Sequence, residues 1–327
     1  MLVGVRATGH RPAPQPGQGS LQQVSAAGAR LALAPFRLLE LLTDPLRQDL
    51  RLGVRRSLGV PERPLEPASD PETAFLDPHG VARRVHADLP AMLVGGLAAL
   101  LLQTLHPLAM AGVAEHSNYR DDPLGRLRRT AAFVGATTFG TKAQAQEAID
   151  QVKRVHRRVR GVAPDGRPYS ANDPELLTWV HAAEMWSFLQ AVQRYGPARF
   201  DTEECDAYYA ETSAVAYTLG AQWVPQSVDE MDAYFRRVRG ELYAGSQALA
   251  ARDFLLRGMG RRPEDRAVHA VLVGAAVGVL PDWARAELRI PSLPAFDALL
   301  VRPLARSLCS GLRWAVRTPG TGAVPPR

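Results

Sequence analysis

Lysine and cysteine are both scarce in this chain of 327 residues. Lys142 and Lys153 are the only lysines, so nearly all of the 39 basic residues are arginines. Arginine together with many alanines, glycines and prolines is typical of a codon-biased source, so the net charge of +6 does not indicate a nucleic-acid partner. Cys205 and Cys309 are too far apart to predict a disulfide framework or a zinc site.

The sequence also lacks an apolar run long enough to cross a bilayer. Within residues 91–114 the uninterrupted apolar part, 91–102, has 12 residues, fewer than the ~18 that a membrane span needs. Polar residues and Pro107 interrupt the rest, so we expect a buried core helix that breaks at His106. The N-terminal stretch has no hydrophobic region of a secretory signal, which predicts a cytoplasmic protein without a transmembrane segment.

Helical periodicity dominates from residue 84 almost to the end of the chain, whereas strand alternation is scarce and no hairpin signal of the Asn-Gly type is found. The best-marked helix spans 174–195, with Asp173 as N-cap, Pro174 at the first helical position and Gly196 just past the end. Its inner face is expected to carry Leu177, Val180, His181, Glu184, Phe188, Ala191 and Val192. Further helical patterns cover 203–220, 228–243, 263–281 and 293–316.

These patterns predict an all-α fold with a single orthogonal helical domain and short disordered ends. The ends are 1–25 and 319–327, where Pro and Gly are frequent. Residues 26–82 are expected to form a helix at 28–43 followed by a surface arm, and residues 83–318 to form the helical domain.

Common catalytic templates are missing. The chain has no Gly-x-Ser-x-Gly, no phosphate-binding loop, no His-Glu-x-x-His and no Gly-rich turn between a strand and a helix. It also lacks the Glu-x-x-His pairs of a di-iron bundle. A polar set embedded in apolar helices remains as the candidate site: His106, Glu115, His116, Arg120, Arg126, Thr130, His156, Arg160, Tyr169, His181 and Glu184.

The stretch QVKRVHRRVRG (151–161) places one histidine among five cations. On a helix, His156 would share an apolar stripe with Val155 and Val159, and Arg160 would follow His156 by one turn. A neutral imidazole on an apolar face is a good ligand for haem iron, and neighbouring guanidinium groups would pair with the haem propionates.

Two alternatives to this haem site stay open. From spacing alone, His156 is more commonly explained as a hydrogen-bonded core histidine, with the arginines as a solvated face. His181 competes with His156 for the ligand role, whereas His106 is expected to mark the helix break.

Several motifs in fixed order also carry a resemblance to a known family. They are LLQTLHPLAMAGVAEHSNYRDDPLGRLRRT, VKRVHRRVRG, DGRPYSANDPELLTWVHA, SFLQAVQRYG and VLPDWARAELRIPSLPAFDALLVRPLAR. Over roughly residues 75–310 the chain resembles a bacterial family grouped with the latex-clearing protein, a rubber oxygenase, and with the MpaB-type oxygenases. The resemblance implies an all-α enzyme around a buried haem b pocket, which uses dioxygen on a carbon–carbon double bond.

The resemblance also implies roles for individual residues. His156 and Arg160 match the family's His-x-x-x-Arg motif, so His156 is implied as the axial iron ligand and Arg160 as a haem-binding residue. Arg126 and Thr130 match its Arg-x-x-x-Thr motif, close to the haem. Arg129 stands where the rubber enzyme has a lysine that can close off the iron, and a guanidinium has no lone pair to do so.

Three hypotheses follow. The first is a haem-dependent oxygenase acting on a small apolar molecule such as an alkene, isoprenoid or polyketide, with dioxygen as co-substrate; a homodimer is compatible with it. The second is a haem carrier or sensor without turnover. The third is a haem-free helical interaction protein whose arginines dock acidic partners.

Overall fold

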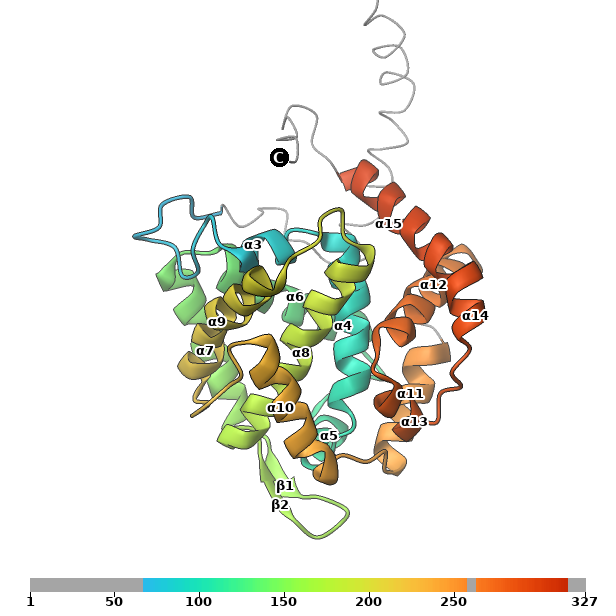
Figure 1. Cartoon of the computed structure of the whole chain (residues 1–327). Helices are drawn as coiled ribbons and strands as arrows, with labels where there is room; N and C mark the ends of the chain where they lie inside the picture. The colour runs from blue at the N-terminus through green and yellow to red at the C-terminus, as the bar shows by residue number, and fades with distance from the viewer. Residues whose placement is uncertain (1–66, 258–262, 317–327) are drawn as a thin grey trace, which may run out of the picture. The chain divides into compact units, whose positions relative to one another are not determined.

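The computed structural model describes residues 67–257 and 263–316, and most of these residues are helical (Figure 1). All of them belong to one compact unit. The α-helices are, in chain order, α3 (Val81–His86), α4 (Leu89–Gln103), α5 (Pro107–His116), α6 (Pro123–Phe139), α7 (Lys142–His156), α8 (Pro174–Tyr195), α9 (Thr202–Leu219), α10 (Val228–Val238), α11 (Ser246–Arg257), α12 (Pro263–Val279), α13 (Asp282–Glu287), α14 (Pro294–Phe296) and α15 (Arg302–Val316). The prediction of an all-α domain is confirmed.

Helices α4 and α8 pack side by side at the centre of this unit (Figure 1). Helix α4 is apolar around most of its circumference because α8, α11, α12 and α15 all pack against it. It ends at Gln103, and α5 starts at Pro107 after a bend of 107°. The predicted break at His106 is therefore confirmed, and no single helix in the described residues is long and apolar enough to cross a membrane.

Helix α8 has the bounds that its local signals predict. The Asp173 carboxylate accepts a hydrogen bond from the Glu175 amide at 2.9 Å, Pro174 is the first helical residue and Gly196 follows the last turn. Of the seven residues expected on its inner face, Val180 is the exception, because its side chain is exposed.

Helices α6 and α7 form an antiparallel hairpin beside α3 and α9. Thr141 begins α7 with a capping box that also uses Gln144. Helix α7 ends at His156, so the expected helical stripe does not continue to Val159, and Val155 is 50% exposed.

A two-stranded antiparallel hairpin follows α7, at a place where the sequence analysis found no hairpin signal. Strand β1 (Arg160–Val162) pairs with β2 (Pro168–Ser170), with Gly161 opposite Tyr169. The turn contains Asp165-Gly166, and Gly166 has φ of 86°, a left-handed conformation that favours glycine. Asp-Gly is itself a hairpin signal, and the sequence interpretation missed it.

Two further helices differ from their predicted bounds. The pattern at 228–243 gives α10 and then a 3₁₀ turn, Arg239–Glu241. The pattern at 293–316 gives α14, a π-helical turn η2 (Asp297–Val301) and then α15. The predicted disordered ends, 1–25 and 319–327, and the predicted helix 28–43 lie outside the described residues. Within the expected surface arm, Ala74 bridges to Thr141 and so ties the arm to the start of α7.

Candidate functional site

Six of the eleven predicted polar residues fall into two groups in space, together with residues that were not predicted. The outer cluster consists of Glu115, His116, Ser117, Arg126 and Tyr169, from α5, the loop after it, α6 and β2. The buried cluster consists of His86, Thr138, His181, Glu184 and Tyr208, from α3, α6, α8 and α9.

The outer cluster is organised around the Tyr169 hydroxyl. This hydroxyl donates to the Glu115 carboxylate and lies 3.1 Å from Nε2 of His116. Burial and the bond to Glu115 raise the pKa of Tyr169 to about 12, so the phenol keeps its proton. Gly161 permits the close approach of the hairpin, because a Cβ at this position would lie 2.7 Å from the same hydroxyl. Glu115 and His116 themselves are exposed.

Arg126 joins the start of α6 to the end of α5. Its Nη1 donates to the Ser117 hydroxyl at 2.7 Å, and burial lowers its pKa. A guanidinium has five N–H donors, so several remain for an anionic group. Beside this bond, residues 114–121 line a cavity of ≈ 300 Å³ that includes Glu115 and His116.

His156 lies at the last residue of α7, three residues before Val159, whose side chain contacts the α5 residue Gly112. The ring is largely buried, and burial lowers its pKa, so it is neutral near pH 7. Its Nδ1 is buried and has no hydrogen-bond partner among the described residues. A buried nitrogen without a partner is unfavourable by itself and is suited to a ligand.

The motif spacing predicts that Arg160 lies one helical turn after His156, and this prediction is wrong. The helix has already ended, and Arg160 is an exposed residue of β1. The backbone of Val159 still turns back on His156, because its amide donates to the His156 carbonyl at 3.1 Å. Arg160 is thus near His156 in sequence but on a different element.

The other residues matched to the upstream motif face outward. Thr130 is exposed, and the Arg129 side chain is 68% exposed and pairs with Asp122 at 3.3 Å. Of the remaining candidates, Arg120 lies over the Tyr119 ring. His106 is buried against Trp179, and its Nδ1 also lacks a partner.

The buried cluster completes the hydrogen bonds of one histidine. Nδ1 of His86 lies 2.7 Å from the Thr138 hydroxyl, and Nε2 lies 3.0 Å from the Tyr208 hydroxyl. The Tyr208 hydroxyl donates to the Met185 sulfur. One neutral tautomer satisfies all of these bonds: Nε2–H donates to Tyr208, and Nδ1 accepts from Thr138.

The electrostatics of the buried cluster favour uncharged side chains. Burial lowers the pKa of His86 to about 3 and that of His181 to about 4. Burial also raises the pKa of Glu184 to about 7. His181, the competing ligand candidate, therefore lies on a buried face of α8 together with one carboxyl that is half-protonated near neutral pH.

Sequence reasoning identified His181 and Glu184 but missed His86, Thr138 and Tyr208. One sequence signal could have identified His86. It follows Ala82 by four residues, which on a helix places both on the same, buried side of α3. Among the described residues no group of three or more His, Cys, Asp or Glu side chains could hold a metal ion. A haem iron takes a single ligand such as histidine from one side, so it does not require such a group.

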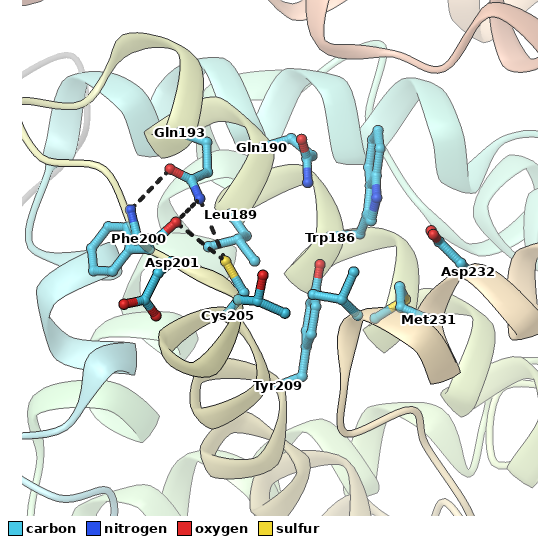
Figure 2. A pocket seen from close by; sticks show the side chains of 12 residues that line it. Trp186, Leu189, Gln190, Gln193, Phe200, Asp201, Cys205, Tyr209, Met231 and Asp232 are labelled. Carbon is cyan, nitrogen blue, oxygen red and sulfur yellow. Dashed lines mark hydrogen bonds between the residues drawn. The ribbon is translucent and has the colours of Figure 1, made fainter.

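A second cavity, of ≈ 360 Å³, lies between α8, α9 and α10 (Figure 2). The side chains of Trp186, Tyr209 and Met231 face it, and Gln193 closes one end by donating to the Phe200 carbonyl. None of the predicted site residues lines this cavity.

A protein-family model described as "ER-bound oxygenase mpaB/B'/Rubber oxygenase, catalytic domain" matches residues 83–314. The matched range contains both clusters and His156. A search of curated proteins and a search of solved structures found no match.

Proposed function

Because the chain belongs to the family of ER-bound oxygenase mpaB/B' and rubber oxygenase catalytic domains, we propose that it is a haem b-dependent oxygenase acting on a small apolar substrate. The family supports oxygenase activity in general terms. The cofactor, the substrate class and the roles of individual residues are our proposal. The observation that carries it is the buried, unpartnered Nδ1 of His156 at the end of α7.

The donor chemistry of this region fits haem b. His156 supplies a neutral imidazole, which is the protonation state that binds iron. Arg126 and Arg160 supply guanidinium groups suited to the two propionates, Arg126 from α6 and Arg160 from β1. A histidine ligand commonly binds iron through one ring nitrogen while the other donates to a carbonyl, carboxylate or water. No described residue offers Nδ1 that partner, so Nδ1 is an equally suitable ligand atom.

Haem would supply the binding and activation of dioxygen, and the chain's residues supply the surroundings of that chemistry. Arg126 holds the loop after α5 through Ser117 and keeps a fixed positive charge beside the cavity. Tyr169 keeps its proton and holds the Glu115 carboxylate in place. Glu115, His116 and Asp121 line the cavity of residues 114–121 and can accept or deliver a proton there.

The substrate class rests on analogy with the family. An alkene, isoprenoid or polyketide would need burial more than ion pairing. Exposed Arg129 and Thr130 contribute little to such a pocket unless the start of α6 rearranges around the bound cofactor. A cytoplasmic location and a homodimer stay predictions, which cell fractionation and size-exclusion chromatography test.

The experiment is an absorption spectrum of the full chain, purified from cells supplied with excess haem precursor, followed by oxygen uptake with candidate alkenes. The proposal expects a Soret band in stoichiometric amount and oxygen uptake that depends on the alkene. A Soret band without any uptake would favour the carrier or sensor hypothesis. A protein that stays colourless after haem reconstitution would contradict both haem hypotheses and favour the hypothesis of a haem-free interaction protein.

A further inference from the structure

Exposed large apolar side chains gather on one short segment of the described chain. Between residues 293 and 304, five such side chains are between 46% and 81% exposed, with Leu299 at the upper limit. They are Leu293, Phe296, Leu299, Leu300 and Leu304, and we call them the α14–α15 surface. A contiguous apolar patch on a folded protein usually marks an interaction site.

The segment is held firmly from its inner side. The Asp297 carboxylate accepts from Arg194 of α8 at 2.5 Å and from Arg302 at 2.8 Å. Ala305 and Cys309 of α15 are buried, and α12 packs against both η2 and α15 (Figure 1). The outward direction of the leucines is therefore set by a fixed packing arrangement. The π-helical turn at Asp297–Val301 adds one residue to the turn and lets Leu299 and Leu300 both face outward.

Arginines outnumber carboxylates in the stretch of chain that carries this surface. Residues 289–306 contain three arginines, Arg289, Arg302 and Arg306, and a single carboxylate, Asp297. Asp297 is already paired with two guanidinium groups. Arg289 and Arg306 are exposed, four residues before Leu293 and two residues after Leu304 in the sequence. The surface thus combines apolar side chains with positive charges and offers no unpaired carboxylate.

We propose that the α14–α15 surface binds an anionic lipid bilayer at its interface. Leucine and phenylalanine side chains of a membrane-surface helix enter the boundary of the acyl chains, while flanking arginines contact lipid phosphates. Charge complementarity selects this occupant over a second copy of the chain. A symmetric contact through this surface would bring Arg289 and Arg306 of two copies together without carboxylates between them.

This inference does not depend on the proposed oxygenase function. The two are compatible, because an apolar substrate concentrates in lipid and a protein held at the bilayer would be close to it. Vesicle binding is measured without haem chemistry, and the absorption spectrum is measured without vesicles. Failure of either proposal is therefore distinguishable from failure of the other.

The experiment is vesicle flotation of the full chain with phosphatidylcholine vesicles, with and without phosphatidylglycerol. We expect binding to the anionic vesicles at least about tenfold stronger than to the neutral ones. Because the Debye length shortens with salt, raising the ionic strength should weaken this preference. The absence of binding to anionic vesicles would overturn the proposal.

Three variants locate the contact. The double variant Phe296→Ser and Leu299→Ser should lose most of the vesicle binding, about tenfold or more. Arg306→Gln should reduce the preference for anionic lipid and leave the weak neutral binding unchanged. Val162→Ser removes an equally exposed apolar side chain on β1 and should have no effect. Circular dichroism melting checks that each variant folds.

Two results would contradict the assignment of this surface to lipid. One is vesicle binding by the Phe296→Ser and Leu299→Ser double variant equal to that of the wild type. The other is a concentration-dependent dimer, seen by light scattering without vesicles, that this double variant abolishes. The second result would make the surface a subunit interface.

Discussion

The outer and buried clusters are built from the same residue types, histidine, tyrosine and a carboxylate, but they differ in what completes their hydrogen bonds. In the buried cluster both nitrogens of His86 are paired with side chains from other helices. In the outer cluster the Tyr169 hydroxyl is satisfied, whereas Glu115 and His116 keep exposed faces beside a cavity. A network whose hydrogen-bonding groups are all paired stabilises the packing. A network whose donors and acceptors are still exposed at a cavity can bind a ligand.

The largest expected difference between the clusters is the loss of stability when a histidine is replaced by alanine. His86→Ala leaves a cavity and two buried hydroxyl groups without their partner, so it should lower the free energy of unfolding by roughly 3–5 kcal/mol. His116→Ala, at an exposed position, should cost about 1 kcal/mol or less. Urea denaturation of both variants measures this. Equal losses would contradict the division into a structural and an accessible cluster.

The second prediction uses the pH dependence of Glu184. Its pKa is raised from 4.5 to about 7 in the folded state, so its favourable contribution is complete below pH 4.5 and is lost as the pH rises through 7. Glu184→Gln should therefore stabilise the protein by roughly 1–3 kcal/mol at pH 8 and have little effect at pH 4. Unfolding curves at the two pH values test this, and a gain that is independent of pH would show that Glu184 is not buried as a neutral acid.

Removing a single hydroxyl group is expected to lower the free energy of unfolding by a smaller amount. Tyr208→Phe leaves Nε2 of His86 without its partner in the core and should cost roughly 1–3 kcal/mol. Tyr169→Phe should cost about 1 kcal/mol or less, because Glu115 and His116 can bind water instead. Thermal melts of the two variants compare them directly. The reverse order would mean that the outer cluster carries more of the fold's stability than its exposure indicates.

The smallest change in stability is expected at Arg160. Its side chain is exposed on β1, so Arg160→Gln should alter the free energy of unfolding by about 0.5 kcal/mol or less. If Arg160 binds a propionate, the same variant should release haem to apomyoglobin faster than the wild type. Arg129→Gln, at an exposed residue of α6 paired with Asp122, is the matched control and should release haem at the wild-type rate.

The sequence predicted well those elements whose signals are local. Helix α8 carries its own N-cap, proline and terminal glycine, and its bounds are confirmed. The break between α4 and α5 follows from His106-Pro107. Each of these features is decided by residues within a few positions of one another.

The prediction was wrong where distant parts of the chain decide the structure. One error was local: the stretch 151–161 was interpreted as one helix, but α7 ends at His156 and the following backbone pairs with β2, through the Asp165-Gly166 turn whose signal was missed. His86 was missed because its partners Thr138 and Tyr208 are 52 and 122 residues away. At the π-helical turn before α15, Asp297 accepts a hydrogen bond from Arg194 of α8, a contact across 103 residues.

The central claim, that the outer end of α7 and not the buried face of α8 provides the iron ligand, is tested most directly by two variants. Full-length His156→Ala and His181→Ala are reconstituted with haem, and their Soret bands are compared with that of the wild type, with circular dichroism as a check on folding. Our account predicts that His156→Ala loses the band while His181→Ala keeps it. A normal band in His156→Ala and its loss in folded His181→Ala would contradict the account and move the site to the buried cluster.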